Sequence, residues 1–302
     1  MSELRHIDVP EQVRDGSLVI VMSMSGGKDS TACALAMREA GVPHRMVFAD
    51  TGWEADETYE HLNHLRERLG PIDVVGAPGG MVAKIQHRAC FPGRLQRWCT
   101  RELKLEPLRS YHDAIEAEGA ETVSVVGIRA EESAARAKFC EWEDDETWGG
   151  WIWRPIMSWP VTDVIAIHHR HGIAMNKLYL EGHDRVGCYP CIYANKEEIR
   201  LVAKRAPERI DLIRSLEKMT EVERAARNLV TPGRYKHPVG TFFQGHGDDY
   251  ETISTAIDRV VEWSQTSRGG RQLPLLPPAP DGGCFRWGMC EPPTETKCVS
   301  TG

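Results

Sequence analysis

Apolar runs of strand length alternate with segments of helical spacing through the first half of the chain. Four runs have the continuous apolar character of buried strands, the last ending in a turn: 17–24, 44–52, 71–78 and 121–133. Three further segments carry apolar residues at helical spacing: 31–41, 54–70 and 102–119. Apolar strands alternating with helices are typical of a parallel sheet covered on both faces, so we expect a doubly wound α/β domain.

The pattern changes beyond about residue 160. Residues 161–172 and 196–230 are helical in spacing, and Pro207 interrupts the second segment. From Gly240 onward the chain is richer in glycine and proline, and residues 272–283 have the composition of an extended linker. We therefore expect a helical extension after the sheet domain, followed by an extended tail that carries cysteines.

Composition and charge narrow the class of protein. With 41% hydrophobic and 27% charged residues, the 302-residue chain can bury a core. The net charge of −7 argues against a broad, non-specific grip on nucleic acid. The sequence shows neither an apolar stretch of about 20 residues, which a membrane span needs, nor a signal-peptide core, so we expect a cytoplasmic protein. In that compartment, nine cysteines favour metal binding or redox chemistry over structural disulfides.

A polar turn links the first expected strand to the first helix: Ser25, Gly26, Gly27, Lys28, Asp29 and Ser30. Two glycines let the backbone approach an anion, and amides at a helix N-terminus point toward phosphate oxygens. Lys28 adds a positive charge, and the two serines add hydroxyl donors. Asp29 is unusual at a bare anion site and is explained if Mg²⁺ arrives with a nucleotide. A plain strand–helix turn with surface charges is the alternative.

Several cysteines are grouped in a way that suits a metal centre. Cys188 and Cys191 form a Cys-Tyr-Pro-Cys turn, and Cys99 directly precedes an expected helix. Cys284 or Cys290 from the tail would complete a four-thiolate site. An iron–sulfur cluster and a zinc ion both accept these ligands, so the residue types alone leave the metal open.

Two other groups of residues suggest chemistry but favour a structural interpretation. His168, His169 and His171 diverge around their expected helix, so we expect them on a solvated helix face rather than around a metal ion. The tryptophans between Trp148 and Trp153 have the ring surface to stack a base, but packing at the edge of the sheet is the favoured interpretation.

The polar turn resembles the pyrophosphatase loop of the adenine-nucleotide alpha-hydrolase superfamily, whose members cleave ATP between its α and β phosphates. Residues 48–52 are similar to the family segment that contacts the nucleoside, which assigns Asp50 and Thr51 to nucleotide binding. They follow the second strand, where ligands bind in doubly wound sheets.

Residues 127–136 are similar to a second substrate segment of the same superfamily. This resemblance assigns Gly127, Arg129 and Arg136 to the nucleotide site. Both arginines would hold phosphate or sulfate through bidentate hydrogen bonds. The alternative is that they are ordinary surface or ion-pair residues.

The run from Trp153 to Cys191, together with Cys99-Thr100 and Leu103-Lys104, resembles the phosphoadenosine phosphosulfate reductase family. The arrangement is most similar to the DNA phosphorothioation sulfurtransferase type and its phage-borne relatives, which implies a 4Fe-4S cluster. Two departures count against sulfate assimilation. The chain lacks the Glu-Cys-Gly-hydrophobic-His tail of the assimilatory reductases, and it lacks the adjacent Cys-Cys pair of the cluster-bearing ones.

Together these resemblances imply three regions and one activity. Residues 1–175 form the nucleotide-binding domain, 176–240 a helical iron–sulfur subdomain, and 241–302 an extended region with the cysteine tail. The hypothesis is an enzyme that uses ATP and Mg²⁺ to adenylylate a substrate, with Lys28 and Asp29 as catalytic residues beside Arg129. It would support sulfur insertion with its cluster, in DNA phosphorothioate modification.

The implied partners are a cysteine desulfurase as sulfur donor, DNA-modification proteins, DNA itself and a second copy of the chain, with no membrane. One alternative keeps the fold but reduces adenylyl sulfate, or its 3′-phosphorylated form, to release sulfite. Another is a non-catalytic, nucleotide-sensing subunit whose cluster is structural.

Overall fold

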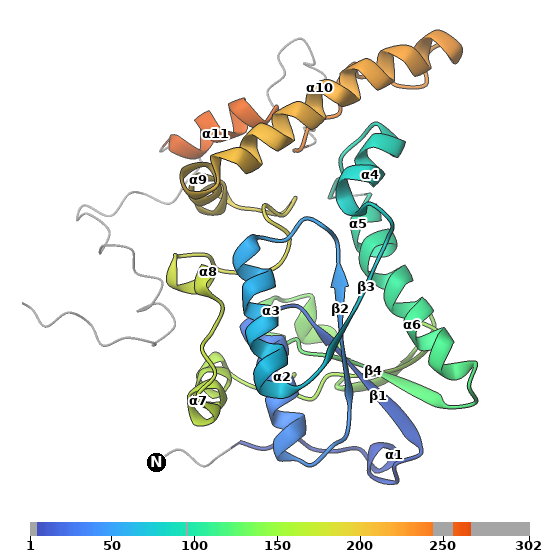
Figure 1. Cartoon of the computed structure of the whole chain (residues 1–302), viewed down its shortest axis with the longest axis vertical. Coiled ribbons are helices and arrows are strands. Elements are labelled where there is room, and N and C mark those ends of the chain that lie inside the picture. Colours follow the sequence, from blue (N-terminus) through green and yellow to red (C-terminus); the bar gives the residue numbers. More distant parts are fainter. Residues whose placement is uncertain (1–4, 95, 244–255, 267–302) are drawn as a thin grey trace, which may run out of the picture.

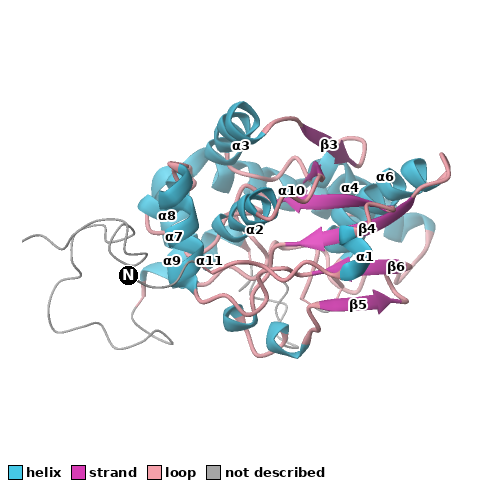
Figure 2. Cartoon of the chain, turned by 90° about the horizontal axis from the view of Figure 1, so that it is seen from below, coloured by secondary structure: helices cyan, strands magenta, loops and turns pink. Residues whose placement is uncertain are grey.

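The computed structural model describes residues 5–94, 96–243 and 256–266. Six strands in these ranges form one sheet in the order β3-β2-β1-β4-β6-β5. Their bounds are β1 (Leu18–Met24), β2 (Arg45–Asp50), β3 (Ile72–Gly76), β4 (Glu121–Val126), β5 (Trp142–Asp145) and β6 (Gly150–Trp153). Neighbouring strands are parallel except β5 and β6, which are antiparallel. Helices flank both faces (Figure 1, Figure 2), so the expected doubly wound α/β fold is confirmed.

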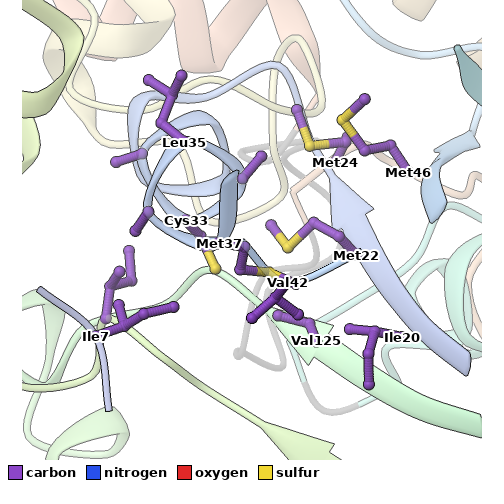
Figure 3. Close-up of a cluster of buried hydrophobic side chains, with 14 of the residues drawn as sticks. Ile7, Ile20, Met22, Met24, Cys33, Leu35, Met37, Val42, Met46 and Val125 are labelled. Carbon is purple, nitrogen blue, oxygen red and sulfur yellow. The ribbon is translucent and has the colours of Figure 1, made fainter. Parts of the chain in front are cut away.

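The central strand β1 shows why the sheet is covered on both faces. Ile20, Met22 and Met24 belong to the main hydrophobic core on one face (Figure 3). Val21 points the opposite way and packs in a smaller core with α6 (Glu106–Glu116). Because both sets are buried, the strand is apolar at every position except Ser23 and shows no regular polar alternation.

Helices on the main-core face are α2 (Lys28–Glu39), α3 (Asp56–Leu69) and α7 (Val161–His171), while the short α1 (Glu11–Arg14) precedes β1 and α8 (Lys177–Leu180) follows α7. On the α6 side, a π-helical turn (Arg101–Leu105) precedes α6 where one continuous helix was expected. Pro107 lacks the N–H that would bond back to Leu103, so the helical ladder widens at this point.

A further helical layer lies beyond the carboxyl ends of the parallel strands (Figure 1). It comprises α4 (Gly80–Arg88), α5 (Trp98–Thr100), α9 (Lys196–Arg205), α10 (Pro207–Val230) and α11 (Ile257–Gln265). These elements share a second apolar core that includes Trp53 and Phe91. The break between α9 and α10 falls at Ala206, as the following proline predicts. No helix in the described part of the chain has the length and apolar character to cross a membrane.

The aromatic segment near residue 150 joins the sheet itself. β6 pairs with β4, and Trp151 stacks on Trp142 of β5 with ring centroids 5.3 Å apart. Trp153 is fully buried in the main core. The sequence did not predict these strands, because four residues are too few to display a two-residue period.

Gly127 lies just after β4, against the start of α2. A Cβ atom here would stand 2.8 Å from Ser30 Cα and 2.9 Å from the Asp29 carbonyl oxygen. We predict that Gly127→Ala lowers the free energy of unfolding by about 1–3 kcal/mol, because backbone must move apart to admit the methyl group. Chemical denaturation measures the change. Gly150→Ala, whose Cβ would meet nothing closer than 3.8 Å, is the matched control, and equal losses in both variants would contradict the close-packing argument.

A buried histidine makes the stability of the fold depend on pH. His112 on α6 contacts Thr122 Oγ1 through Nδ1 at 2.7 Å and meets Trp148 edge to face. Burial lowers the pKa of His112 to about 4, from an ordinary value near 6.5. The unfolded chain therefore binds this proton first. The stabilisation is complete above about pH 6.5 and is lost as the pH falls toward 4.

We predict that His112→Asn flattens the loss of unfolding free energy between pH 6.5 and about 4, by at most about 3 kcal/mol across that interval. Asparagine keeps a polar group near Thr122 but does not titrate. Denaturant titrations at several pH values measure the slope, and His87→Asn, at an exposed histidine, is the control. An unchanged slope in His112→Asn would show that the acid sensitivity arises elsewhere.

Candidate functional site

The polar turn between β1 and α2, here called the phosphate loop (residues 25–30), is closed by its own hydroxyl groups. Ser25 Oγ and Ser30 Oγ lie 3.0 Å apart, and the Ser25 N–H donates to Ser30 Oγ. The Gly27 carbonyl accepts from the hydroxyls of Ser30 and Thr31. The loop thus runs directly into the first turn of α2, whose N-terminal amides favour an anion.

Two cations share one carboxylate at this helix start. Lys28 Nζ lies 2.7 Å from Asp29 Oδ2, and Arg129 Nε lies 2.6 Å from Asp29 Oδ1. All three residues are at least nine-tenths buried. Burial alone would lower the pKa of Arg129, but the charge of Asp29 and the hydrogen bonds to Asp29 and Glu131 together outweigh it, and the pKa is raised. Asp29 therefore has a role that needs no metal ion, and its predicted link to Mg²⁺ stays a prediction.

Three side chains from α7 and the segment that follows it contact the phosphate loop: His168, Asn176 and Tyr179. The Lys28 N–H donates to the Tyr179 hydroxyl at 3.2 Å, and Asn176 Nδ2 donates to the Gly26 carbonyl at 3.3 Å. His168 Nε2 lies 2.9 Å from the Lys28 carbonyl. His168 is only 2% exposed, so placing it on a solvated helix face was wrong: the α7 turn that carries it packs on α2. His169, one residue on, is exposed.

The two predicted anion-binding arginines are placed differently. Arg129 reaches the phosphate loop, whereas Arg136 forms an ion pair with Glu132 on the exposed segment that follows. Short 3-10 turns at Ala130–Glu132 and Arg136–Lys138 shape this segment. Arg129 therefore contacts the phosphate loop, whereas Arg136 would have to break its ion pair with Glu132 to reach it.

The predicted nucleoside residues lie on the loop after β2. Asp50 Oδ1 accepts from the Tyr59 hydroxyl and from the Gly52 N–H, each at 2.8 Å. Thr51 is fully buried, and its hydroxyl lies 2.8 Å from the carboxylate of Glu54. Asp50 thus fixes the loop at the carboxyl edge of the sheet. Glu54, which the sequence did not assign to a role, fixes Thr51.

The same loop docks onto the Cys-Tyr-Pro-Cys segment, here called the cysteine turn (residues 188–191). The Tyr189 N–H donates to the Trp53 carbonyl at 2.8 Å, and Trp53 Nε1 donates to the Pro190 carbonyl at 3.0 Å. Glu54 and Cys188 form an antiparallel bridge between the two segments. The loop after β2, here called the nucleoside loop (residues 50–54), and the cysteine turn are therefore held together as one unit by hydrogen bonds.

The phosphate loop lies against the segment that leads into the cysteine turn. Val186, two residues before the cysteine turn, lies 3.8 Å from where a Cβ of Gly27 would stand, and Tyr179 Oη lies 3.2 Å from the same point. No side chain larger than hydrogen fits at Gly27 without pressing on Tyr179. The phosphate loop and the cysteine turn consequently lie at the same edge of the sheet.

Three of the predicted thiol ligands line one small cavity. Cys99, Cys188 and Cys191 surround about 20 Å³ of space together with apolar side chains of the second core. Burial raises the pKa of Cys188 to about 11 and also raises the pKa of Cys99. Lys104, on the π-helical turn, faces the thiols, and the nearby Cys188 raises its pKa.

The donor set suits either a zinc ion or an iron–sulfur cluster, so the predicted cluster stays a prediction. In the described ranges, no three His, Cys, Asp or Glu side chains lie close enough together to hold one metal ion. Zinc gathers all its thiolates around one ion at about 2.3 Å, whereas each thiolate of a 4Fe-4S cluster binds a different iron. Cys99, Cys188 and Cys191 line one cavity and would supply thiolates to either centre. The predicted fourth ligands, Cys284 and Cys290, lie outside the described residues.

Sequence reasoning missed the residues that connect the parts of the site. Lys104 and Tyr179 belong to segments that resemble the family pattern, but no spacing argument gives either a role. Glu54 and His168 act through contacts with segments more than a hundred residues away. Cys33, which follows the phosphate loop on α2, is fully buried in the main core.

Comparison with known sequences identifies relatives across most of the chain. The phosphoadenosine phosphosulfate reductase domain matches residues 19–194. An uncharacterized 37.8 kDa protein of Escherichia phage 186 is 32% identical over 321 residues, covering 86% of this chain and 92% of the phage protein. Adenosine 5′-phosphosulfate reductase of Allochromatium vinosum is 28% identical over 181 residues, covering 58% of this chain and 68% of that enzyme.

Solved structures resemble the chain more weakly. Phosphoadenylyl-sulfate reductase from Candida auris has a TM-score of 0.46 at 14% identity, covering 62% of this chain and 99% of that one. FMN adenylyltransferase from Candida glabrata has a TM-score of 0.45 at 14% identity, covering 60% and 59%. The family match itself spans more than half of the chain and includes the phosphate loop, Arg129 and the cysteine turn. The chain belongs to the phosphoadenosine phosphosulfate reductase domain family, whose members are enzymes of nucleotide-dependent sulfur chemistry.

Proposed function

We propose that the protein is an ATP pyrophosphatase that adenylylates a substrate and supports sulfur insertion beside an iron–sulfur cluster. One observation carries the proposal: Tyr179 and Val186, which precede the cysteine turn, lie against Gly27 of the phosphate loop, so the loop and the cysteine cavity share one edge of the sheet. A nucleotide held by the loop would therefore have its reactive end near the thiols.

The positive groups around the phosphate loop suit the negative charge of a polyphosphate. Lys28 and Arg129 converge on it from two elements, and the N-terminus of α2 adds the partial positive charge of its amides. Asp29 holds both cations in place. Phosphate oxygens entering the loop would compete with Asp29 for Lys28, so binding exchanges one buried ion pair for another and leaves no charge unpaired.

The proposed reaction begins at the α phosphorus of ATP. An oxygen of the substrate attacks it, the bond between the α phosphorus and the bridging oxygen to the β phosphorus breaks, and pyrophosphate leaves. Lys28 and Arg129 would stabilise the negative charge that develops on the phosphate oxygens. A sulfur nucleophile then displaces the activated oxygen, which leaves as part of AMP. Mg²⁺ would enter with the ATP.

We further propose that Cys99, Cys188 and Cys191 hold three corners of a 4Fe-4S cluster, with Cys284 or Cys290 as the fourth ligand. Such a cluster supplies electron transfer and sulfur handling next to the activated substrate. Lys104 faces the three thiols and would offset the negative charge of the ligated thiolates.

For the acceptor we propose the DNA backbone, in phosphorothioate modification, with a cysteine desulfurase as the sulfur donor. The resemblance to DNA phosphorothioation sulfurtransferases supports this assignment, and so does the absence from the sequence of the Glu-Cys-Gly tail that takes sulfite from adenylyl sulfate. Homo-oligomers and DNA-modification proteins are the further partners that this assignment implies.

Reduction of an adenylyl sulfate is the second candidate. Adenosine 5′-phosphosulfate reductases from several bacteria match about half of the chain or more at 25–29% identity. The candidate would use the same phosphate loop to bind the nucleotide already made. Sulfite release from adenylyl sulfate with a dithiol reductant, without pyrophosphate release from ATP, would select it.

We predict that Lys28→Ala lowers the rate of magnesium-dependent pyrophosphate release from ATP by about 10²–10³-fold, because one electrostatic donor to the developing charge is lost. Full-length protein with duplex DNA and a desulfurase is the assay mixture. Lys177→Ala, at an exposed lysine of α8 that pairs with Glu181, is the control and should retain the rate. Wild-type protein that releases no pyrophosphate with any acceptor tried would remove the proposed activity.

We also predict that protein purified without oxygen is brown and contains about four irons and four sulfides per chain. Cys188→Ser should lose most of this iron, whereas Cys140→Ser, at an exposed cysteine outside the cavity, should keep it. Visible absorption and iron and sulfide analysis measure the outcome. Colourless protein with stoichiometric zinc would contradict the cluster and leave the nucleotide proposal in place.

A further inference from the structure

Cationic and aromatic side chains lie on the segment that follows the cysteine turn and on the elements that contact it, and the proposed chemistry uses none of them. We call this group the stacking platform, and it consists of Arg94, Arg97, Tyr193, Lys196 and Trp263. Tyr193 is 36% exposed and Trp263 is 45% exposed, so part of each ring is open to solvent. Both arginines are exposed.

Each exposed ring has a cation over it. The guanidinium carbons of Arg94 and Arg97 lie 5.5 and 5.3 Å from the centroid of Tyr193, and Lys196 Nζ lies 4.8 Å from that of Trp263. Within the part of the chain that the structure describes, neither arginine forms an ion pair with a carboxylate. Their charge is therefore available to an incoming anion.

Backbone contacts hold the platform in shape. The Tyr193 hydroxyl donates to the Arg94 carbonyl at 3.1 Å, and Lys196 Nζ donates to the Thr266 carbonyl at 2.6 Å. Helix α11, which carries Trp263, packs on α9, whose first residue is Lys196 (Figure 1). The rings are thus presented on fixed elements, and a ligand does not pay to order them.

The platform adjoins the thiols. The Tyr193 N–H lies 3.5 Å from Cys191 Sγ, and Arg97 lies two residues before Cys99 in the sequence. Arg185 also lies beside Cys191 and raises the local positive charge. A ligand held on the platform would have part of its length at the mouth of the cavity.

Exposed rings interleaved with cations match one class of partner best. Every nucleobase has a flat face that stacks on an aromatic ring, and the phosphates between bases attract the cations. In a duplex the base faces are covered by neighbouring pairs, so only an unpaired strand can use the rings. Two exposed acids on the neighbouring helices form ion pairs within their own helix: Glu197 with Arg200, and Glu262 with Arg259.

We propose that the stacking platform binds a single-stranded nucleic acid segment and leads its backbone to the cysteine cavity. This rests on the proposed function only for the identity of the sulfur acceptor, since the binding itself needs neither ATP nor turnover. With Arg94 and Arg97 as the two cations that meet phosphates, the plot of log binding constant against log salt concentration should have a slope of about −1.4. A chain of net charge −7 is consistent with such a local grip.

The test is fluorescence anisotropy of full-length protein with a labelled single strand of about 12 nucleotides. Tyr193→Leu and Trp263→Leu should each weaken binding by about tenfold, because one base–ring stack is lost. Arg94→Ala combined with Arg97→Ala should bring the salt slope nearer to zero by about 1.4. Phe139→Leu, at another exposed ring with an arginine over it, is the matched control and should bind as the wild type does.

Trp263 keeps the test independent of the cluster, because it lies on α11 and does not neighbour a cysteine in sequence. Duplex DNA bound as tightly as the single strand would overturn the proposal, as would wild-type affinity in both leucine variants. A glutamate-rich peptide that binds with the strand's affinity and loses it in the same variants would also overturn it, in favour of an acidic protein partner. Strand binding without pyrophosphate release would leave the platform in place and remove the proposed activity.

Discussion

The docking of the nucleoside loop onto the cysteine turn is the contact on which the rest of the site depends. Backbone groups make most of it: the Tyr189 N–H reaches the Trp53 carbonyl, and the Trp53 indole reaches the Pro190 carbonyl. The side chains of Cys188 and Cys191 therefore take no part in the contact that positions the cysteine turn. A turn tied to the carboxyl end of β2 lies where parallel sheets place their ligands, so thiols and nucleotide share one edge.

The three buried charges at the phosphate loop are explained better by ligand binding than by stability. Taking Lys28, Asp29 and Arg129 out of water costs several kcal/mol per ion, and apolar replacements of similar volume often leave a protein equally stable. Stability alone therefore gives little reason for three charges at the start of α2. An incoming polyphosphate gives a better one, because it would find its cations already oriented and largely desolvated.

Local patterns made much of this fold predictable, and long-range contacts account for most of what was not. A strand such as β1, buried on both faces, has to be largely apolar, and the geometry of a glycine-rich turn between strand and helix can be predicted from six consecutive residues. His168 has no such local sign: its burial follows from α7 packing on α2, across 140 residues. The pairing of Glu54 with Cys188 likewise exists only once the chain has folded.

The distribution of charge shows how a chain of net charge −7 can accommodate the two proposed anion-binding features, which differ in kind. At the phosphate loop, Lys28 and Arg129 are buried and already paired with Asp29, so an anion must replace a carboxylate in a fixed geometry. At the stacking platform, Arg94 and Arg97 are exposed and contribute mainly attraction. Salt screens exposed charges far more than buried ones. Shape therefore selects the nucleotide at the loop, while the platform relies on charge and ring surface, and ionic strength acts chiefly on the second.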